Sequence, residues 1–251
     1  PLNLYIAENF KQRFPICLIV FGVPQIPFSP TEYYRKYSFI DITVRGDGEK
    51  PFRDILLRAI NSRDFSNIPG ISWREQNTKQ CITNSQEVAF NKDLDEYPSP
   101  YLEGLYEYLF TENKNLKFQV IIATNRGCVF RCSFCSWDKG GLNARYRFHS
   151  LERIRSEIEW CVKHKIEYVF NADSNFGMFK RDVNITSMLV EFKKKYGYPE
   201  KFRTCFSKNT NDLVFNIGSL LHSNKLEKGI TLSSQSNSSE VLKNVHRKNI
   251  K

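Results

Sequence analysis

The chain reads TNRGCVFRCSFC from Thr124 to Cys135, and the prediction of the fold starts from this stretch. It places three thiols at Cys128, Cys132 and Cys135, in a loop that follows the apolar run 118–123. Thiols at steps of four and three residues can converge on one inorganic centre. The other four cysteines are scattered along the chain, at Cys17, Cys81, Cys161 and Cys205.

Two kinds of metal centre fit a loop with three thiols. Structural zinc is tetrahedral and takes a fourth nearby Cys or His, but the first His after the loop is His149. A [4Fe-4S] cluster held by three thiolates keeps one iron open. An open metal position is typical of a reactive site rather than a structural one.

The CxxxCxxC spacing, with the aromatic Phe134 directly before the last Cys, resembles the radical S-adenosylmethionine (SAM) superfamily. The resemblance implies that the three thiolates hold a [4Fe-4S] cluster whose fourth iron chelates the amino and carboxylate groups of SAM. Reductive cleavage would give a 5′-deoxyadenosyl radical, with a one-electron reductant such as flavodoxin or ferredoxin as partner. Phe134 is expected against the adenine, and an aromatic packed in a loop is the alternative.

From residue 116 onward, short apolar runs alternate with amphipathic helical patterns, which predicts βα units. The expected strands are 118–123, 167–170, 203–206 and 230–233. The expected helices are one that Ser150 caps, then 182–195, 213–221 and 240–251. By the resemblance these are the first four βα units of a partial barrel of six units, so the last two strands would be missing.

Loops that follow the strands carry the catalytic groups of such barrels. The loop after the second expected strand reads NADSNFG from Asn171 to Gly177. The resemblance implies that Asp173, with Asn175 beside it, binds the amino group of SAM. A turn built by Asn and Asp without a ligand is the alternative. Further candidates for SAM follow the later expected strands: Ser207 with Lys208 beside it, and, for the ribose, Ser233 and Gln235.

The first part of the chain shows the same alternation in shorter elements. A helical pattern runs from Leu2 to Phe14, strands are expected at 16–21 and 39–44, a capping box at 29–32, and a helix over 52–60. Such alternation predicts a parallel α/β sheet. Ligands of these sheets bind at the carboxyl ends of the strands.

This part resembles the second half of the Rossmann-like cobalamin-binding domain that precedes many radical SAM enzymes. The matching pieces are the strand that ends at Gly22 and the segment IDITVRGDGE, Ile40–Glu49. The resemblance implies cobalamin contacts at Gly22, Gly46, Gly48 and Glu49. Two features depart from the family: Val23 replaces a second Gly, and the opening strands are absent. Simple tight turns at the glycines are the alternative.

The expected organisation is α/β in three stretches. Residues 1–63 are the C-terminal half of a cobalamin-binding-like domain, 64–115 are a connector, and 116–251 are the N-terminal part of a radical SAM core. The connector has a short strand at 71–74 and an apolar helix through 102–109. The chain is therefore expected to be a fragment of a longer protein and inactive alone.

Composition excludes some function classes. The chain has 251 residues, of which 41% are hydrophobic, so it can bury a core. No run reaches the roughly eighteen apolar residues of a membrane helix, and no signal peptide opens the chain. Clustered free thiols predict a reducing compartment, the cytoplasm. The net charge of +10 is spread along the chain, which favours a solvated surface over a nucleic-acid interface.

The resemblance predicts a cobalamin-dependent radical SAM methyltransferase that acts on an unactivated carbon of a small molecule or peptide. One SAM would methylate cobalamin, and a second would supply the radical that abstracts a hydrogen from the substrate. A related enzyme that catalyses cyclisation, rearrangement or methylthiolation is an alternative. A non-catalytic iron–sulfur or zinc-binding module is another, and metal analysis separates it because only the enzyme requires iron with sulfide.

Overall fold

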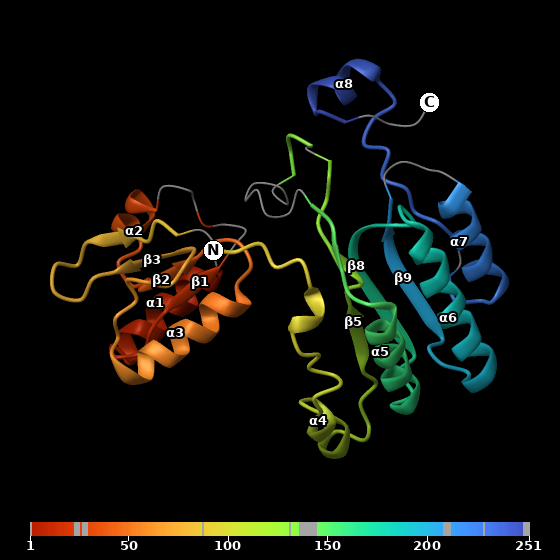
Figure 1. The fold of residues 1–251 in the computed structure, drawn as a ribbon, viewed down its shortest axis with the longest axis horizontal. Coiled ribbons are helices and arrows are strands. Elements are labelled where there is room, and N and C mark those ends of the chain that lie inside the picture. The colour runs from red at the N-terminus through yellow and green to blue at the C-terminus, as the bar shows by residue number, and fades with distance from the viewer. Residues whose placement is uncertain are drawn as a thin grey trace. The chain divides into compact units, whose positions relative to one another are not determined.

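A computed structural model describes residues 2–22, 26, 30–86, 88–130, 132–135, 145–207, 212–227 and 229–247. The chain forms two compact α/β units that meet in sequence between Phe90 and Asn91 (Figure 1). The predicted connector is thus divided between the units, and its first strand belongs to the first sheet. The assignment of the three stretches to named domains stays a prediction.

The sheet of the first unit has the strand order β1-β2-β3-β4. β1 (Val20–Gly22) is parallel to β2 (Ile42–Val44), whereas β3 (Ile71–Arg74) and β4 (Cys81–Thr83) are added in antiparallel pairs. The prediction of a parallel sheet was therefore only partly right. The link from β3 to β4 is a short excursion, and strands joined in this way pair antiparallel because a parallel pair needs a long crossover.

The helices of the first unit agree with the sequence pattern. They are α1 (Leu2–Arg13), α2 (Thr31–Lys36) and α3 (Glu49–Asn61). The predicted capping box includes Ser29, which lies outside the described residues. Pro30 is the N-cap of α2 and makes no side-chain capping bond.

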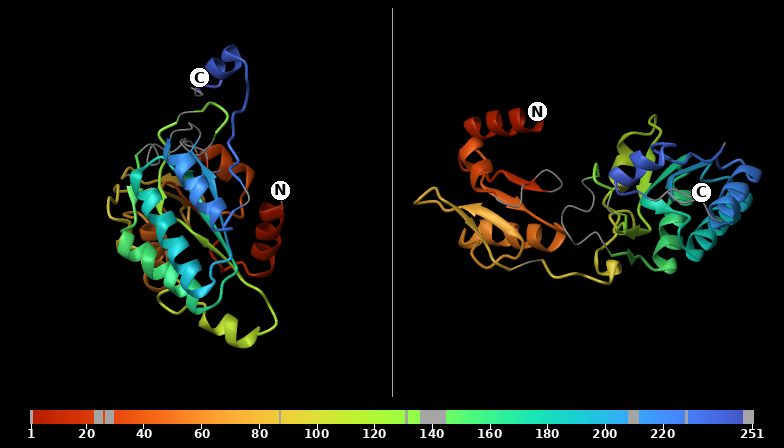
Figure 2. Two further views of the ribbon diagram at one scale, coloured as in Figure 1. Left: turned by 90° about the vertical axis from the view of Figure 1, so that its right-hand side faces the viewer. Right: turned by 90° about the horizontal axis from the view of Figure 1, so that it is seen from above.

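The second unit is built on the parallel sheet β5-β8-β9. Its strands are β5 (Gln119–Ile122), β8 (Tyr168–Phe176) and β9 (Lys201–Phe206), with Val169 of β8 facing Val120 on one side and Phe202 on the other. The helices α5 (Leu151–Lys163), α6 (Lys180–Tyr196) and α7 (Asp212–Ser223) lie side by side along the sheet (Figures 1 and 2). Their apolar faces and the strands form one core.

Shorter elements complete the second unit. They are a 3-10 turn, Leu94–Glu96, and α4 (Glu107–Glu112) before the sheet, and α8 (Ser239–Asn244) near the end of the chain. The predicted cap of α5 is confirmed, because Ser150 Oγ accepts a hydrogen bond from the backbone nitrogen of Arg153 at 3.0 Å. The last predicted helix is shorter than expected, and residues 248–251 lie outside the described part.

Two predictions about the strands need correction. β8 extends to Phe176, so most of the polar stretch predicted as a loop belongs to the strand, with an irregular register between Asn171 and Phe176. The fourth strand, 230–233, does not form among the described residues. Its apolar pattern has another cause, because Ile230 packs on α7. Its side chain lies so close to Gly218 that a Cβ there would be 2.1 Å from Cδ1 of Ile230. The described residues therefore contain three βα units rather than four.

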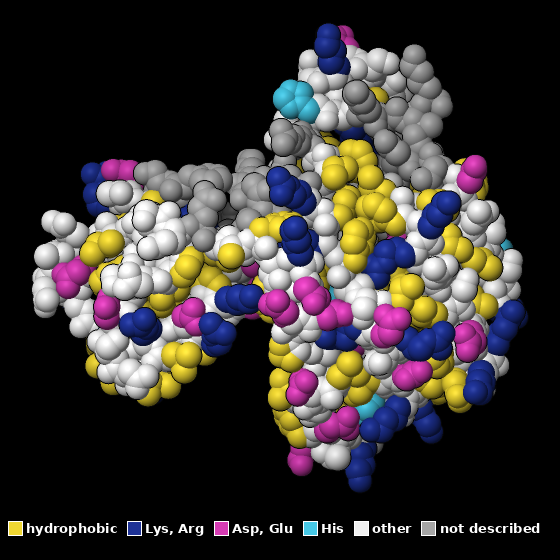
Figure 3. All heavy atoms as spheres, viewed as in Figure 1, with side chains coloured by type: hydrophobic (Ala, Val, Ile, Leu, Met, Phe, Trp, Pro, Cys, Tyr) yellow, Lys and Arg dark blue, Asp and Glu magenta, His cyan; other side chains and the backbone are white. Residues whose placement is uncertain are grey.

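The surface has no block of one charge on the face that Figure 3 shows, where Lys and Arg are interspersed with Asp and Glu. Within the described residues, no helix is long and apolar enough to cross a membrane.

Candidate functional site

The loop that carries the three cysteines is closed by a short ladder. β6 (Asn125–Arg126) pairs antiparallel with β7 (Arg147–Phe148), so the chain leaves the sheet after β5 and returns next to its exit. The backbone nitrogen of His149 extends the ladder by donating to the carbonyl oxygen of Thr124 at 3.1 Å. This ladder fixes both ends of the cysteine loop.

Gly127 allows the two ends of this loop to lie in contact. Its φ is +123°, and a Cβ at this position would lie 2.4 Å from the carbonyl oxygen of Arg145. Residues with a side chain rarely adopt this backbone conformation, and here the backbone of Arg145 also fills the space that a Cβ would need. From β8, Ser174 Oγ donates to the carbonyl oxygen of Gly127 at 2.6 Å. The backbone directly before Cys128 is thus held from two sides.

The three thiols differ in exposure. Cys128 and Cys132 are buried and Cys135 is half-buried. A turn joins the last two, because the backbone nitrogen of Cys135 donates to the carbonyl oxygen of Cys132 at 3.0 Å. The loop also contacts the end of α8, where the nitrogen of Ser133 donates to the carbonyl oxygen of Val245.

The donor set of the loop consists of three thiols. Among the residues that the structure describes, no three His, Cys, Asp or Glu side chains are arranged around one ion position. In a [4Fe-4S] cluster each thiolate binds a different iron, so the three sulfurs need not meet at one point. Three thiols on one short loop supply the ligands that such a cluster takes. The residues present therefore fit the cluster that the sequence predicts.

Asp173 ties the start of the cysteine loop to the middle of the sheet. Its buried carboxylate accepts five hydrogen bonds: from the backbone nitrogens of Thr124 and Asn125, from the hydroxyl of Thr124, and from the side-chain amides of Asn125 and Asn171. Burial raises the pKa of Asp173, and these bonds oppose the increase. A carboxylate has about four lone-pair sites, so hydrogen bonds from the chain itself already occupy the oxygens of Asp173.

Asn175 lies two residues further along β8 and points to the same face. Its Nδ2 lies 3.3 Å from Sγ of Cys128, 2.9 Å from Oη of Tyr146 and 3.0 Å from Oγ of Ser174. Its buried Oδ1 has no hydrogen-bond partner among the described residues. Burial, and next the nearby thiol of Cys128, raise the pKa of Tyr146 to about 12.

The other predicted SAM contacts are divided between two places. Ser207 is buried at the end of β9, and its backbone nitrogen donates to the carbonyl oxygen of Phe176 at 2.7 Å, which places it beside the end of β8. Phe134 is 55% exposed. Ser233 and Gln235 are exposed and follow no strand, and the carbonyl oxygen of Ser233 accepts a bond from Arg247. Lys208 lies outside the described residues.

Several residues of the hydrogen-bond network around Asp173 and Asn175 were not singled out from the sequence. Thr124 and Asn125 end the run before the cysteines, and Asn171 precedes Asp173 by two positions on β8. Because alternate residues of a strand point to one face, the spacing of Asn171, Asp173 and Asn175 could have identified the shared face. Nothing in the sequence pattern marked the remaining members, Tyr146 and Arg181. The guanidinium of Arg181 donates to the carbonyl oxygens of Thr124 and His149.

In the first unit, the glycines predicted to contact cobalamin lie at one edge of the sheet. β1 ends at Gly22 and the parallel β2 ends at Val44, so the loop 45–48 follows at the same edge. Gly46 has a φ of +77°, and Gly48 is the N-cap of α3, which begins at Glu49. The structure brings the four residues to adjacent loops, and their role stays a prediction.

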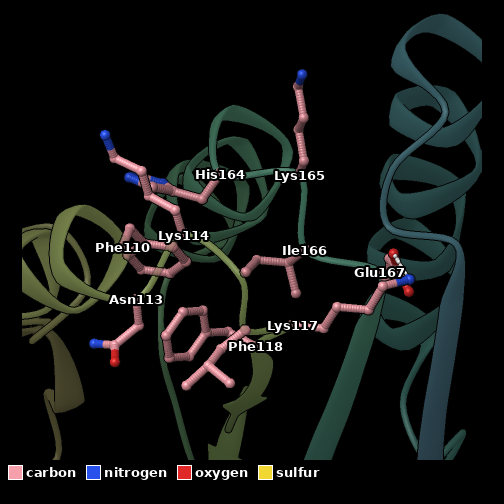
Figure 4. A pocket seen from close by; sticks show the side chains of 10 residues that line it. Phe110, Asn113, Lys114, Lys117, Phe118, His164, Lys165, Ile166 and Glu167 are labelled. Atoms are coloured by element: carbon pink, nitrogen blue, oxygen red, sulfur yellow. Dashed lines mark hydrogen bonds and ion pairs between the residues drawn. The ribbon is translucent and has the colours of Figure 1, made fainter.

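A pocket of about 200 Å³ lies at the opposite end of the second sheet, beside the starts of β5 and β8. Figure 4 shows Phe110, Phe118 and Ile166 facing one another within it, while Lys114 and Lys165 point away. Lys117 is paired with Glu167 at 2.7 Å. No cysteine lines this pocket, so it is separate from the candidate site.

Comparison with known proteins identifies long relatives. No family model matches the chain. It is 35% identical over 251 residues to the cobalamin-dependent radical SAM methyltransferase TokK of Streptomyces tokunonensis. The alignment covers 99% of this chain and 36% of TokK. Identity and coverage are the same for 2-(S-pantetheinyl)-carbapenam-3-carboxylate methyltransferase of Streptantibioticus cattleyicolor. The chain thus spans about a third of the length of these relatives.

A solved structure has the same fold. The radical S-adenosylmethionine methyltransferase TsrM from Kitasatospora setae, with tryptophan substrate and the SAM analogue aza-SAM bound, superposes with a TM-score of 0.66. The alignment covers 96% of this chain and 45% of TsrM at 18% sequence identity. At this identity the likeness concerns the fold alone, and it includes both units because it covers nearly the whole chain.

Proposed function

Because this chain belongs to the cobalamin-binding-domain radical SAM family, we propose that the protein is a cobalamin-dependent radical SAM methyltransferase. The observation that carries the proposal is the cysteine loop, whose three thiols lie at the carboxyl edge of a parallel sheet, where such enzymes place their reactive groups. The identity of 35% to two methyltransferases over 99% of the chain supports the same reaction type.

In this proposal Cys128, Cys132 and Cys135 hold a [4Fe-4S] cluster. When bound, the cluster supplies the electron that cleaves SAM, and cobalamin supplies the methyl group. Asp173 acts on SAM indirectly: it holds the loop from which the cluster binds SAM, since its own oxygens are occupied by five donors. The ladder of β6 and β7 keeps the loop closed.

The SAM contacts that remain proposals start from Asn175. Its Oδ1 is a buried acceptor without a partner among the described residues, and an ammonium group such as that of SAM would satisfy it. Ser207, at the end of β9, lies beside the next residue of β8, because its backbone nitrogen donates to the carbonyl oxygen of Phe176. Three further contacts have less support from the geometry because their side chains are exposed: Phe134, Ser233 and Gln235.

On the cobalamin side, the loops at Gly22 and at Gly46 to Glu49 supply at most one wall of a site. Enclosure is what makes cofactor pockets tight. We therefore expect residues 1–251 alone to retain cobalamin weakly. The finer parts of the proposal are an unactivated carbon of a small molecule or peptide as methyl acceptor, a flavodoxin or ferredoxin as reductant, and the cytoplasm as compartment, where thiols stay reduced.

Anaerobic reconstitution with iron and sulfide tests the proposal. The protein should bind about four irons per chain, and each of Cys128→Ala, Cys132→Ala and Cys135→Ala should abolish binding. Cys161→Ala and Cys205→Ala are the matched controls, because these thiols lie on α5 and β9, outside the loop, and both variants should bind iron normally. The loaded full-length protein should release 5′-deoxyadenosine from SAM when a reductant is added.

Two results would contradict the proposal at different levels. Uptake of zinc without iron and sulfide would indicate a non-catalytic zinc-binding module instead of a radical SAM enzyme. A full-length protein that cleaves SAM but shows no cobalamin absorbance after supplementation would remain a radical SAM enzyme and would not be a cobalamin-dependent methyltransferase.

A further inference from the structure

The side-chain amide of Asn175 contacts one of the cysteines directly. Its Nδ2 lies 3.3 Å from Sγ of Cys128, within hydrogen-bond distance for sulfur. Both residues are buried, Asn175 completely. Water therefore does not compete for the amide hydrogens, and the low local dielectric strengthens the interaction.

The orientation of this amide suits a thiolate. A sulfur that binds iron has lost its proton and can only accept a hydrogen bond. Nδ2 carries two hydrogens and lies near three acceptors, namely the sulfur of Cys128, Oη of Tyr146 and Oγ of Ser174, so that two of the acceptors share one hydrogen. Turning the amide over would place its oxygen against the thiolate, where two partial negative charges would repel each other.

Tyr146 supports this orientation from the other side of the amide. Its hydroxyl donates to Sδ of Met178 at 3.3 Å, so its lone pairs face Nδ2 of Asn175. The phenol keeps its proton at neutral pH, because the ordinary pKa of a tyrosine is about 10. Its ring is fixed against Phe179, at 4.8 Å between centroids.

We propose that Asn175 is a positioning residue whose N–H···S hydrogen bond to Cys128 sets the reduction potential of the cluster. The inference rests on the proposed function, in which Cys128 is an iron ligand. A hydrogen bond to a ligand sulfur withdraws negative charge from the cluster and so stabilises the reduced form, which carries one more electron. The bond therefore raises the potential and makes the cluster easier to reduce.

The test compares Asn175→Leu with Val169→Ala in the anaerobically reconstituted protein. Leu has the branched skeleton of Asn and no donor. Val169 is the control, because it is equally buried on the same strand, pairs with β5 and β9 in the apolar core, and is not part of the network that holds the cysteine loop. The measurements are the iron content and a potentiometric titration of the cluster followed by EPR spectroscopy.

We expect N175L to have a more negative midpoint potential than the native protein, and V169A to have the native potential. The ratio of reduced to oxidised cluster at a fixed potential should fall about tenfold in N175L, which is about 59 mV for a one-electron couple. A native potential in N175L, or an equal shift in both variants, would overturn the inference. An equal shift would mean that loosening of β8 is the cause.

If N175L does not hold iron, Asn175→Gln decides, because glutamine keeps the amide donor. Iron binding in N175Q with a potential nearer to native supports the hydrogen bond, and loss of iron in both variants contradicts it in favour of a packing role. A native protein that binds no iron–sulfur cluster would refute the proposed function itself. A native cluster with an unshifted N175L potential would refute only the inference.

Discussion

The helices of the two units show the same apolar periodicity and bury it to different extents. In the second unit, α6 buries Ile185, Leu189 and Phe192 against the sheet. In the first unit, α1 has no buried residue, and α3 buries only Pro51 and Ile55. A period of 3.6 residues therefore indicates a helix with an apolar face, and it does not tell what covers that face.

The polar residues at the strand ends differ in the same way. In the second unit a buried network around Asp173 joins β8 to the cysteine loop. In the first unit the corresponding loop, 45–48, is half-buried and built around glycine. The carboxylate of Asp41, just before β2, pairs with Lys11 of α1 at 2.8 Å and accepts a hydrogen bond from the backbone nitrogen of Ile19. The second unit thus holds its cysteine loop with side chains of its own, whereas the loop 45–48 of the first unit contains two glycines, which offer no side chains for such a network.

The largest effect is expected where these carboxylates are removed. Asp173→Ala leaves five buried donors without their acceptor, and the loss of a buried charged partner costs about 3–5 kcal/mol. Asp41→Ala breaks bonds to Lys11 and to the backbone nitrogen of Ile19, but it is partly exposed, so we expect about 1 kcal/mol. Chemical denaturation of each variant measures the free energy of unfolding.

The same pair of variants also tests the indirect role of Asp173 in the full-length reconstituted protein. Asp173→Ala should lower both cluster content and SAM affinity, since it releases the loop. A variant with full cluster content and reduced SAM affinity would instead indicate that Asp173 contacts SAM directly. Equal destabilisation by Asp173→Ala and Asp41→Ala would remove the contrast between the two units.

The next largest effect on stability is expected when a leucine on a buried helix face is compared with a leucine on an exposed one. Leu189→Ala on α6 removes a fully buried side chain and should cost about 2–5 kcal/mol. Leu57 on α3 is 54% exposed, so Leu57→Ala in residues 1–251 should change the free energy of unfolding by less than about 0.5 kcal/mol. A cost of several kcal/mol for Leu57→Ala in a longer form of the protein would show that this face is covered there.

The sequence predicted most elements and the cysteine loop because both depend on local patterns. Ser150 caps α5 as its position indicates, and the three helices that pack on the second sheet follow the expected apolar spacing. The fourth strand was wrong because a strand forms only when a neighbour offers a ladder, and Ile230 found burial on α7 instead. The roles of Tyr146 and Arg181 could not be predicted, since their contacts join residues distant in sequence.

The pH dependence of stability should distinguish the buried edge of the second unit. Burial raises the pKa of Asp182 from its ordinary value of 3.8 to about 6, and two backbone donors, at Gly177 and Phe179, oppose the increase. The folded state therefore binds more protons than the unfolded state between these values, so stability falls as pH rises from about 4 to 6. At about 1.4 kcal/mol for each pKa unit, the loss approaches about 3 kcal/mol.

Asp182→Asn mimics the protonated carboxyl and keeps an oxygen for the two backbone donors. This variant should be more stable than the native protein above pH 6 and should lose most of the slope between pH 4 and 6. The raised pKa of Asp173 leaves a slope of the same sign in the variant. Urea denaturation at several pH values measures both, and a native slope in the variant would assign the pH dependence to other groups.

The smallest effect concerns the first turns of α5 and α3, which begin with different caps. Ser150 Oγ caps α5, whereas Gly48 at the start of α3 offers no side chain. Ser150→Ala should cost about 1 kcal/mol, and Gly48→Ser should stabilise by only a few tenths of a kcal/mol, because glycine is itself a fair N-cap. Gly48 tolerates the change sterically, since its φ is −88° and no atom lies within 4 Å of an added Cβ. Thermal unfolding measures both variants, and cobalamin binding by the full-length Gly48→Ser protein adds a second readout. If Gly48 lies against cobalamin as proposed, the serine should weaken cofactor binding while the helix gains stability; unchanged binding would leave Gly48 with the role of an N-cap alone.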